Sequence, residues 1–539
     1  MECDVVGISN GGRRILDLVN GSQWHRWNGE YSMLPFVRKL DVPEGGSGLL
    51  PALWDGLWAD ASEYACVLES GKGGRYTIVG ARPVSVLTGR GPQVQVMENR
   101  DDRWVQLYEA QGEPIHMMRD WLNQTTAPKL AGVPDCIGGV LGFWSYDMAR
   151  HLEKIPESAV DDLQLPDFLY QRYTQLWIAD HRENAIYAAV HTPISGKLDT
   201  QQLERKFRQA EETAAQMEQS WIRWRETADS PELAAKRRAM LRRIEEQPMN
   251  LDVEKVPGLQ TSLDKHDFMQ AVERVREYIA QGDVFQVNLS LRQSRPSAAD
   301  PEELYEWLRL VNPSPYMGCL RTPEFSLVSA SPELLVKMDG GRLTTRPIAG
   351  TRRRGRTPDE DRAMEDELLT NEKERAEHVM LVDLERNDLG RVAAYGSVKV
   401  PELLTVEKYS HVMHLVSQVE ARLASGKDAL DVMAAVFPGG TITGAPKIRT
   451  MEIIEELEPV RRGAYTGAMG WIDYSGDMEF NIVIRTILWR DGLCHIQAGA
   501  GIVIDSDPER EFYECLNKAK ALWTAEAYAR GTPNDSGDR

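Results

Sequence analysis

Two predicted helices carry glutamates at a spacing that places them on one helical face. Glu374 and Glu377 are three residues apart, and Glu511 and Glu514 repeat that spacing. If the pairs converge, carboxylates about 4 Å apart repel each other by about 4 kcal/mol at an effective dielectric near 20. A cation must then compensate, and Mg²⁺ is the hard, oxygen-preferring choice. From the spacing alone, acidic residues on a helix are more often simply solvated.

A single arginine interrupts an apolar run that predicts a strand. Arg485 lies in NIVIRTILW, and burying its charge is costly without an anionic partner. The planar guanidinium matches a carboxylate, so the residue indicates either a bound carboxylate or a structural ion pair. Tyr465, in RRGAYTGAMGW, is compatible with binding a ligand or with packing alone.

Three small-residue stretches are predicted to be turns that could hold an anion. They are PIAGT at 347–351, PGGTITGAPK at 438–447 before a helix to about residue 457, and QAGAG at 497–501, which interrupts a strand. Glycines let backbone N–H groups approach a ligand, and a helix N-terminus favours an anion. The second stretch is not a nucleotide P-loop, because Ala445 and Pro446 separate Gly444 from Lys447 and no Ser or Thr follows.

The elements that must position these residues follow from periodicity. Residues 358–390 predict one long helix ending before Leu389-Gly390, and a second helix begins at Ser506-Asp507-Pro508. Residues 62–190 alternate with period two, which predicts a mostly antiparallel sheet, whereas residues 1–60 are Gly-rich and irregular. The expected organisation is an N-terminal extension (1–45), an N-terminal domain (46–192), a charged helical segment and linker (193–259), a catalytic domain (260–529) and a disordered tail (530–539).

Length and composition exclude several classes of protein. The 539 residues suit roughly two to four globular domains, with 42% hydrophobic and 27% charged residues. A net charge of −19 argues against a nucleic-acid partner, and no run approaches the roughly 18 apolar residues of a membrane helix. The start of the chain shows no secretion signal, and the six cysteines are scattered without a CxxC pair. We expect a cytoplasmic enzyme with reduced thiols.

Seven ordered motifs resemble those of the chorismate-utilising enzymes. They are PIAGT, EHVMLVDLERNDLG, YSHVMH, FPGGTITGAPK, IRT, QAGAGIV and a final E-x-x-E-x-x-x-K. The family includes component I of anthranilate synthase and of aminodeoxychorismate synthase, and the isochorismate and salicylate synthases. The resemblance is dense over 260–527 and looser over 40–190, the family's N-terminal domain. It implies an α+β fold in which two large antiparallel sheets pack as a sandwich with helices outside.

The resemblance also implies a set of site residues for chorismate, which carries two carboxylates. A carboxylate would be held by Arg485, Tyr465, Lys518 and the backbone of Gly499, Ala500 and Gly501. The ring site would be lined by Gly350, Thr351 and Thr441. Mg²⁺ would be held by Glu377 and Glu514, supported by Glu374 and Glu511.

Two residues match the family's proton-transfer groups. Glu333, in SASPELL, matches the general acid that protonates the departing C4 hydroxyl. That role requires a raised pKa, which nearby anions would provide. His414 matches the base linked to loss of pyruvate.

The residue at position 286 indicates which nucleophile is added. Family members that add water place a lysine base where this chain has Gln286. Ammonia needs no deprotonation to attack, so glutamine there favours amination, with ammonia from a separate glutamine amidotransferase subunit.

Amination at C4 gives aminodeoxychorismate, whereas amination at C2 with loss of pyruvate gives anthranilate. Ala349 replaces the nucleophilic lysine of many C4-aminating enzymes and is typical of anthranilate synthases. QVN at 286–288, TRPIAGT at 345–351 and MEFN at 478–481 favour the aminodeoxychorismate branch, of the type that lacks the lysine. We therefore expect C4 amination. Anthranilate synthesis is the alternative, and a non-catalytic tryptophan- or chorismate-binding subunit is an alternative of another class.

A second ligand is implied by two further matches. Ser70 in VLES, with Pro315, Tyr316 and Met317 in NPSPYM, matches the family's tryptophan pocket between the domains. The same residues are compatible with an ordinary turn and loop.

Overall fold

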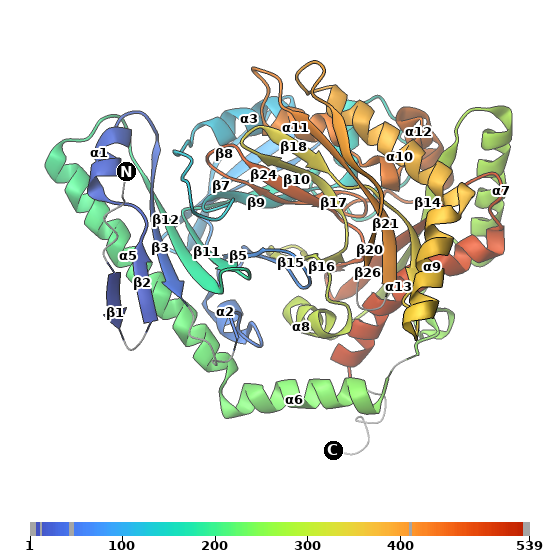
Figure 1. The fold of residues 1–539 in the computed structure, drawn as a ribbon, viewed down its shortest axis with the longest axis horizontal. Coiled ribbons are helices and arrows are strands. Elements are labelled where there is room, and N and C mark those ends of the chain that lie inside the picture. The colour runs from blue at the N-terminus through green and yellow to red at the C-terminus, as the bar shows by residue number, and fades with distance from the viewer. Residues whose placement is uncertain (1–6, 11–12, 42–47, 249, 409–411, 532–539) are drawn as a thin grey trace.

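The structure is a computed structural model that describes residues 7–10, 13–41, 48–248, 250–408 and 412–531. Two large antiparallel sheets pack against each other, and the helices lie around them (Figure 1). This confirms the α+β sandwich that the sequence predicts. The polar tail predicted at 530–539 lies almost wholly outside the described residues.

Within the described residues, the larger sheet has fourteen strands. In spatial order they are β1 (Gly7–Asn10), β2 (Arg13–Asp17), β3 (Met33–Asp41), β12 (Ala185–Pro193), β11 (Gln175–Asp180), β5 (Tyr76–Gly80), β4 (Ala65–Glu69), β15 (Tyr316–Arg321), β16 (Ser326–Ser331), β25 (Thr486–Arg490), β26 (Leu493–Ile502), β14 (Gln286–Pro296) and β13 (Gln260–Thr261), with β22 (Gly444–Ala445) paired to β14.

The second sheet has twelve strands in the same part of the chain. Their order is β19 (Ile348–Arg353), β21 (Val412–Arg422), β18 (Arg342–Thr345), β17 (Leu334–Asp339), β24 (Met478–Ile482), β23 (Ala468–Ile472), β9 (Gly139–Trp144), β10 (Phe168–Tyr173), β6 (Ser85–Arg90), β7 (Gln93–Arg100) and β8 (Arg103–Gln111), with β20 (Lys399–Lys408) paired to β21. Segments 46–192 and 260–529 share both sheets, because β4 pairs with β15 and β9 with β23. The division into two domains at these boundaries stays a prediction.

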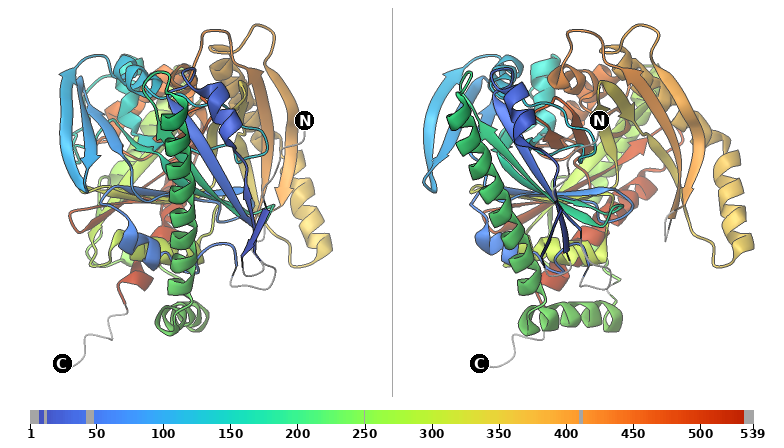
Figure 2. Two further views of the ribbon diagram at one scale, coloured as in Figure 1. Left: turned by 90° about the vertical axis from the view of Figure 1, so that its left-hand side faces the viewer. Right: turned by 60° about the vertical axis from the view of Figure 1, so that its left-hand side comes forward.

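The helices lie on the outer faces and at the ends of the sheets. They are α1 (Gly21–Trp27), α2 (Asp55–Asp60), α3 (Pro114–Asn123), α4 (Ala149–Leu152), α5 (Thr200–Ala228), α6 (Pro231–Glu246), α7 (Lys265–Gln281), α8 (Pro301–Val311), α9 (Pro358–Thr370), α10 (Glu372–Gly390), α11 (Ala429–Val436), α12 (Lys447–Leu457) and α13 (Pro508–Ala529). The charged segment forms α5, which runs lengthwise along the outside of the larger sheet, and α6 (Figure 2). None of the helices in the described ranges could cross a membrane.

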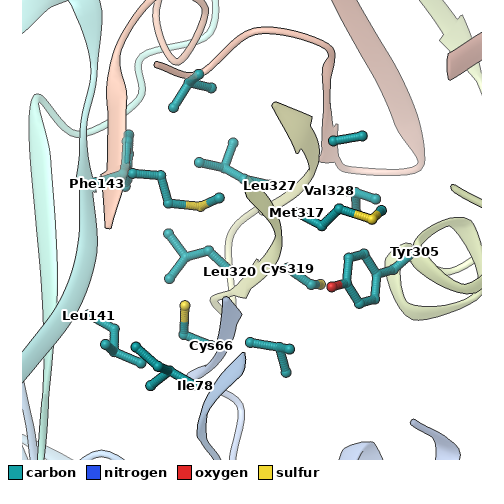
Figure 3. Close-up of a cluster of buried hydrophobic side chains, with 14 of the residues drawn as sticks. Cys66, Ile78, Leu141, Phe143, Tyr305, Met317, Cys319, Leu320, Leu327 and Val328 are labelled. Carbon is teal, nitrogen blue, oxygen red and sulfur yellow. The ribbon is translucent and has the colours of Figure 1, made fainter. Parts of the chain in front are cut away.

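The interior between the sheets is filled by apolar side chains from strands of both. Leu141 and Phe143 on β9 face Cys66, Ile78 and Leu327 from the larger sheet (Figure 3). All five are buried. Full burial of each large apolar side chain contributes about 1.5–3 kcal/mol relative to exposure. This core fixes the relative position of the two sheets and therefore of the residues at their junction.

The expectation that residues 1–60 are irregular is wrong. The strand β3 pairs with β12 along its whole length, from Met33 opposite Pro193 to Asp41 opposite Ala185. Its partner is about 150 residues away in sequence, so local composition, dominated by neighbouring glycines, could not indicate the pairing.

The single helix predicted for residues 358–390 is in fact two helices. Asn371 ends α9 and caps α10, and its side chain accepts a hydrogen bond of 3.0 Å from the Glu374 backbone N–H. Asparagine competes for backbone hydrogen bonds and so favours caps over helix interiors. Glu374 and Glu377 therefore lie in the first two turns of α10, and Gly390 is its last residue rather than lying beyond its end.

Candidate active site

One cavity of about 760 Å³ gathers most of the predicted site residues. The predicted residues that line it are Gln286, Glu333, Gly350, Glu374, Glu377, His414, Thr441, Tyr465, Arg485, Gly499, Gly501, Glu511, Glu514 and Lys518. They come from both sheets, from α10 and α13, and from the short helical turn Gly440–Ile442. Residues more than 200 positions apart in sequence thus share one solvent-accessible space.

Two of the predicted residues occupy different positions. Ala500 lies on β26 between two cavity-lining glycines, and its side chain is fully buried in the core. Only its backbone could contribute to the site. Thr351 belongs to β19, but its side chain is outside the described part of the structure.

Glu333 and Arg485 lie where the chain crosses from one sheet to the other. Glu333 joins β16 of the larger sheet to β17 of the smaller one, and Arg485 lies between β24 and β25. The two crossings are bonded together, because the Glu333 carbonyl accepts from the Ile482 N–H and the Arg485 carbonyl from the Ala330 N–H, both at 3.0 Å.

The apolar run around Arg485 predicts that it lies inside a strand. In the structure it lies outside one, between β24 and β25. Its φ of 49° places it in the left-handed region, which a non-glycine residue rarely adopts. This conformation marks the point at which the chain changes sheets. Burial lowers the pKa of the guanidinium, and the negative charge of Glu333 partly offsets that effect.

The carboxyl group of Glu333 has the raised pKa that an acid catalyst needs. Burial raises the pKa to about 7, against the lowering effects of the Thr441 hydroxyl and the charges of Arg485 and Lys518. Desolvation disfavours the ionised carboxylate, and the nearby cations only partly compensate. The protonated acid form of Glu333 is therefore accessible near neutral pH.

His414 is held on β21 opposite the Gly350 region of β19. Its pKa is lowered by burial and by the charge of Arg485, while a bond to the Gly350 backbone acts in the opposite direction. The imidazole is consequently neutral at pH 7 and able to accept a proton.

PIAGT forms a bulged strand rather than the predicted turn. The register of β19 against β21 shifts between Ala349 and Thr351, and Gly350 has a φ of 64°. A Cβ at Gly350 would lie 2.7 Å from Glu374 Oε2. The glycine thus permits both the bulge and the close approach of that carboxylate.

QAGAG likewise does not interrupt its strand. β26 continues to Ile502, with Gly499 opposite Ser290 and Gly501 opposite Asn288 on β14. A Cβ at Gly499 would lie 2.5 Å from Asn288 Oδ1, and one at Gly501 would lie 2.4 Å from Gln286 Nε2. These glycines make room for amide side chains of the neighbouring strand.

Cationic and hydroxyl groups line the cavity alongside the acids. Lys518 donates to the Gly499 carbonyl at 2.8 Å and pairs with Glu514 at 2.8 Å. Burial raises the pKa of the Tyr465 hydroxyl, so it remains a neutral hydrogen-bond donor. Together with Arg485, these groups could bind a carboxylate.

The four glutamates are the right kind of donor for Mg²⁺. Arg352 pairs with one oxygen of Glu374 at 2.7 Å, and Glu374 Oε2 is buried with no partner among the described residues. That orphaned oxygen and the hard carboxylate set fit a divalent cation. In the described ranges no three ligand-type side chains are already gathered around one point.

The residues predicted to bind tryptophan are brought together elsewhere. Ser70 follows β4, which pairs with β15, and Gly71 N–H donates to the Ser314 carbonyl at 3.0 Å. A Cβ at Gly74 would lie 2.3 Å from Ser70 Oγ and 3.6 Å from the Pro315 carbonyl. Tyr316 begins β15 and Met317 follows it within the strand. The structure thus joins two segments about 245 residues apart.

Sequence reasoning missed seven polar residues of the cavity wall. They are Asn288, Arg352, Gln497, Asp505, Ser506, Asp507 and Arg510. For Asn288 and Gln497 a signal was present, because 286 and 288 share one face of a strand and 497, 499 and 501 share another. Treating QAGAG as a turn concealed that alternation.

The chain belongs to the chorismate binding enzyme family, whose model matches residues 64–524. Aminodeoxychorismate synthase component 1 of Bacillus subtilis (strain 168) is 44% identical over 467 residues, covering 87% of this chain and 92% of the relative. Anthranilate synthase component 1 of Thermus thermophilus is also 44% identical, over 465 residues, covering 85% of this chain and 90% of the relative. The predicted resemblance to chorismate-utilising enzymes is confirmed.

Solved structures agree on the fold. Anthranilate synthase component I from Streptococcus pneumoniae TIGR4 aligns with a TM-score of 0.63 and 31% identity, over 83% of this chain and 92% of that one. The menaquinone-specific isochorismate synthase MenF of Escherichia coli aligns with a TM-score of 0.62, over 92% of this chain and 95% of that one. At 16% identity it supports the fold alone.

Proposed function

We propose that this chain is the chorismate-aminating component of an aminodeoxychorismate synthase, which replaces the C4 hydroxyl of chorismate by an amino group for para-aminobenzoate and folate synthesis. The observation that carries amination is the pair Gln286 and Asn288, whose side chains line the cavity where water-adding relatives are expected to hold a lysine base. The choice of C4 rests on the sequences QVN at 286–288, TRPIAGT at 345–351 and MEFN at 478–481. Neutral amides cannot deprotonate water, whereas ammonia needs no such base.

The chain's own residues divide the reaction between them. Arg485, Lys518 and Tyr465 bind the carboxylates of chorismate. Glu333 gives a proton to the C4 hydroxyl, the C–O bond breaks and water leaves. A C–N bond to ammonia forms, and the nitrogen loses one proton, so chorismate and ammonia give aminodeoxychorismate and water. His414 has no pyruvate to eliminate on this route and acts as a neutral proton acceptor.

Mg²⁺ is proposed to bind at Glu374, Glu377, Glu511 and Glu514. When bound, it would shield a substrate carboxylate from the acidic side chains of the cavity. The separate source of ammonia is proposed to be a glutamine amidotransferase, since the relatives are named as component 1 of their enzymes.

Anthranilate synthesis is the second candidate, and one observation favours it. Ala349 lines the cavity, so this position offers no lysine to form a covalent bond to the ring. The 44% identity to an anthranilate synthase component is equal to that of the aminodeoxychorismate relative.

Tryptophan is proposed as a further ligand near Ser70, whose hydroxyl oxygen is buried with no partner among the described residues. Asn481, on the strand that leads to Arg485, donates to the Tyr316 carbonyl at 3.4 Å and so connects the two regions. Equilibrium dialysis with labelled tryptophan tests binding, and Ser70→Val with undiminished binding would contradict this location.

A product assay separates the two functions. The purified chain is incubated with chorismate, Mg²⁺ and excess ammonium at alkaline pH, and the products are resolved by mass. Aminodeoxychorismate without pyruvate supports the proposal. Anthranilate with stoichiometric pyruvate overturns the C4 assignment, and isochorismate as the sole product overturns amination itself. Unaltered chorismate with tryptophan bound would favour a non-catalytic subunit.

A further inference from the structure

Three residues that line the active-site cavity have a buried amide oxygen without a hydrogen-bond donor. These oxygens are Gln286 Oε1, Asn288 Oδ1 and Gln497 Oε1, and none has a partner in the part of the chain that the structure describes. Buried polar atoms are almost always paired in folded proteins, so three orphaned acceptors at one cavity indicate a ligand that donates hydrogen bonds.

The orientation of two of these amides is fixed by their neighbours. Gln286 Nε2 donates to Glu377 Oε1 at 3.0 Å, and because a carboxylate only accepts, the amide oxygen must point away from it. Gln497 Nε2 donates to Ser290 Oγ at 2.8 Å, and that hydroxyl donates onward to Glu458 at 2.8 Å. Ser290 can therefore only accept from Gln497.

The Glu458 end of this chain of bonds is itself anchored. Arg462 holds both oxygens of Glu458, at 2.7 and 2.9 Å, in a pair that is almost completely buried. The direction of every hydrogen bond from Arg462 to Gln497 is therefore determined: Arg462 and Ser290 donate to Glu458, and Gln497 donates to Ser290. In that arrangement the Gln497 carbonyl cannot turn toward Ser290.

Asn288 is held by its backbone. Its N–H donates to the Thr443 carbonyl at 2.8 Å, and its own carbonyl accepts from Arg462 Nη2 at 2.7 Å. Gly499 on the adjacent strand leaves the space that Asn288 Oδ1 occupies, since any Cβ there would lie 2.5 Å from it. The structure thus builds a defined place for this amide.

The chemistry of this row of oxygens does not match chorismate. Chorismate offers two carboxylates and an ether oxygen, which are acceptors, and its single hydroxyl is its one good donor. Its acceptors match Arg485 and Lys518 instead. Ammonia offers three N–H donors and one lone pair, so acceptor oxygens can hold its hydrogens and leave the lone pair free to attack carbon.

We propose that Gln286, Asn288 and Gln497 form the ammonia subsite of this enzyme, an inference that rests on the proposed ammonia-dependent amination. Gln497 and Tyr465 also line a second cavity of about 20 Å³, room for one molecule of the size of water or ammonia. Gln497 and Tyr465 thus line both this small space and the main cavity.

The test is the steady-state kinetics of the chain with ammonium and no glutaminase, varying ammonium and chorismate separately. Asn288→Leu removes the acceptor and keeps the volume, and it should raise the KM for ammonium about tenfold while leaving the KM for chorismate unchanged. Asn288→Asp keeps an oxygen at the same place and should restore the ammonium KM to within about twofold of the wild type.

A matched control lies on the same strand. Gln293 is also buried, but its Oε1 already accepts from Trp523 Nε1 at 2.7 Å and it does not line the cavity. Gln293→Leu should lower the melting temperature without changing the KM for ammonium. If Asn288→Leu does not fold, the same ammonium and chorismate KM values are measured for Gln497→Met, which also removes an acceptor oxygen and keeps the volume.

The outcomes distinguish this inference from the proposed function. Equal changes in both KM values, or no change in either, overturn the subsite whatever the product is. If the wild type makes anthranilate, the C4 assignment fails, but a selective rise in the ammonium KM still supports the subsite. If the wild type adds only water, both proposals are overturned.

Discussion

The wall of the cavity formed by β14 and β26 carries neutral amides, whereas the wall formed by α10 carries glutamates. On the amide wall, which consists of Gln286, Asn288 and Gln497, each side chain projects from a strand bonded to its neighbour. On the glutamate wall, which consists of Glu374 and Glu377, the side chains lie in the first turns of a helix.

The two walls differ in how their geometry is fixed. The amide wall is fixed by hydrogen bonds, from Gln286 to Glu377 and from Gln497 to Ser290, so it is formed before any ligand arrives. Glu374 is held by the long side chain of Arg352, an ion pair in which both partners are about one-fifth exposed. That pair uses one oxygen of Glu374 and leaves Oε2 without a partner among the described residues. A neutral wall held by hydrogen bonds thus meets a charged wall held by an ion pair.

The largest expected effect is on the glutamate wall. Glu377→Gln keeps the shape but removes the charge, and kcat should fall at least about a hundredfold if this carboxylate holds Mg²⁺. Titrating Mg²⁺ against initial rate measures the loss. Glu372→Gln on the same helix, exposed and outside the cavity, is the control. Normal turnover by Glu377→Gln would remove the metal proposal.

Loss of the crossing arginine should act mainly on binding. Arg485→Ala should raise the KM for chorismate roughly a hundredfold, because a charged hydrogen-bonding group to a carboxylate is worth about 3 kcal/mol. The KM for ammonium should change little, which sets this cation apart from the amide wall. Arg386→Ala, an exposed residue paired with Asp383, serves as the control. An unaltered chorismate KM would place Arg485 outside the binding site.

The pH dependence should follow Glu333. Its pKa of about 7 means that the acid form predominates below pH 7 and is lost above it. At a fixed concentration of free ammonia, kcat should fall about tenfold per pH unit on the alkaline limb of its pH profile. The carboxylates of bound chorismate would raise the pKa of Glu333 further and so shift this limb to higher pH. Glu333→Gln should be slow with no such limb. A limb that persists in that variant belongs to another group.

The smallest expected effect comes from filling the space between the strands. Gly499→Ala places a Cβ 2.5 Å from Asn288 Oδ1 and 2.9 Å from the Tyr465 hydroxyl. Overpacking should destabilise the fold by about 1–3 kcal/mol and raise the ammonium KM a fewfold. Thermal unfolding and kinetics measure the two effects. Gly390→Ala, with nothing within 4 Å of its Cβ, should leave both unchanged, and equal behaviour of the two variants would show that the strands can relax.

The glutamate wall was easier to predict than the amide wall. Glu374 and Glu377 share a helical face whether or not the helix is broken at Asn371, because that break falls before both. Gln497, Gly499 and Gly501 were assigned to a turn, since glycines in a short window are typical of turns. Only pairing with β14 shows that they continue a strand, and that pairing joins positions about 200 residues apart.

The sequence by itself identified the family through its ordered motifs, and that resemblance implied the sandwich fold and most of the residues that line the cavity. The tertiary structure alone decided where Glu333 and Arg485 stand and what surrounds them. Their apolar flanks resemble uninterrupted strands, and the change of sheet between them depends on partners far away in the chain. Burial at that junction raises the pKa of Glu333, and no local pattern in the sequence records burial that distant strands create.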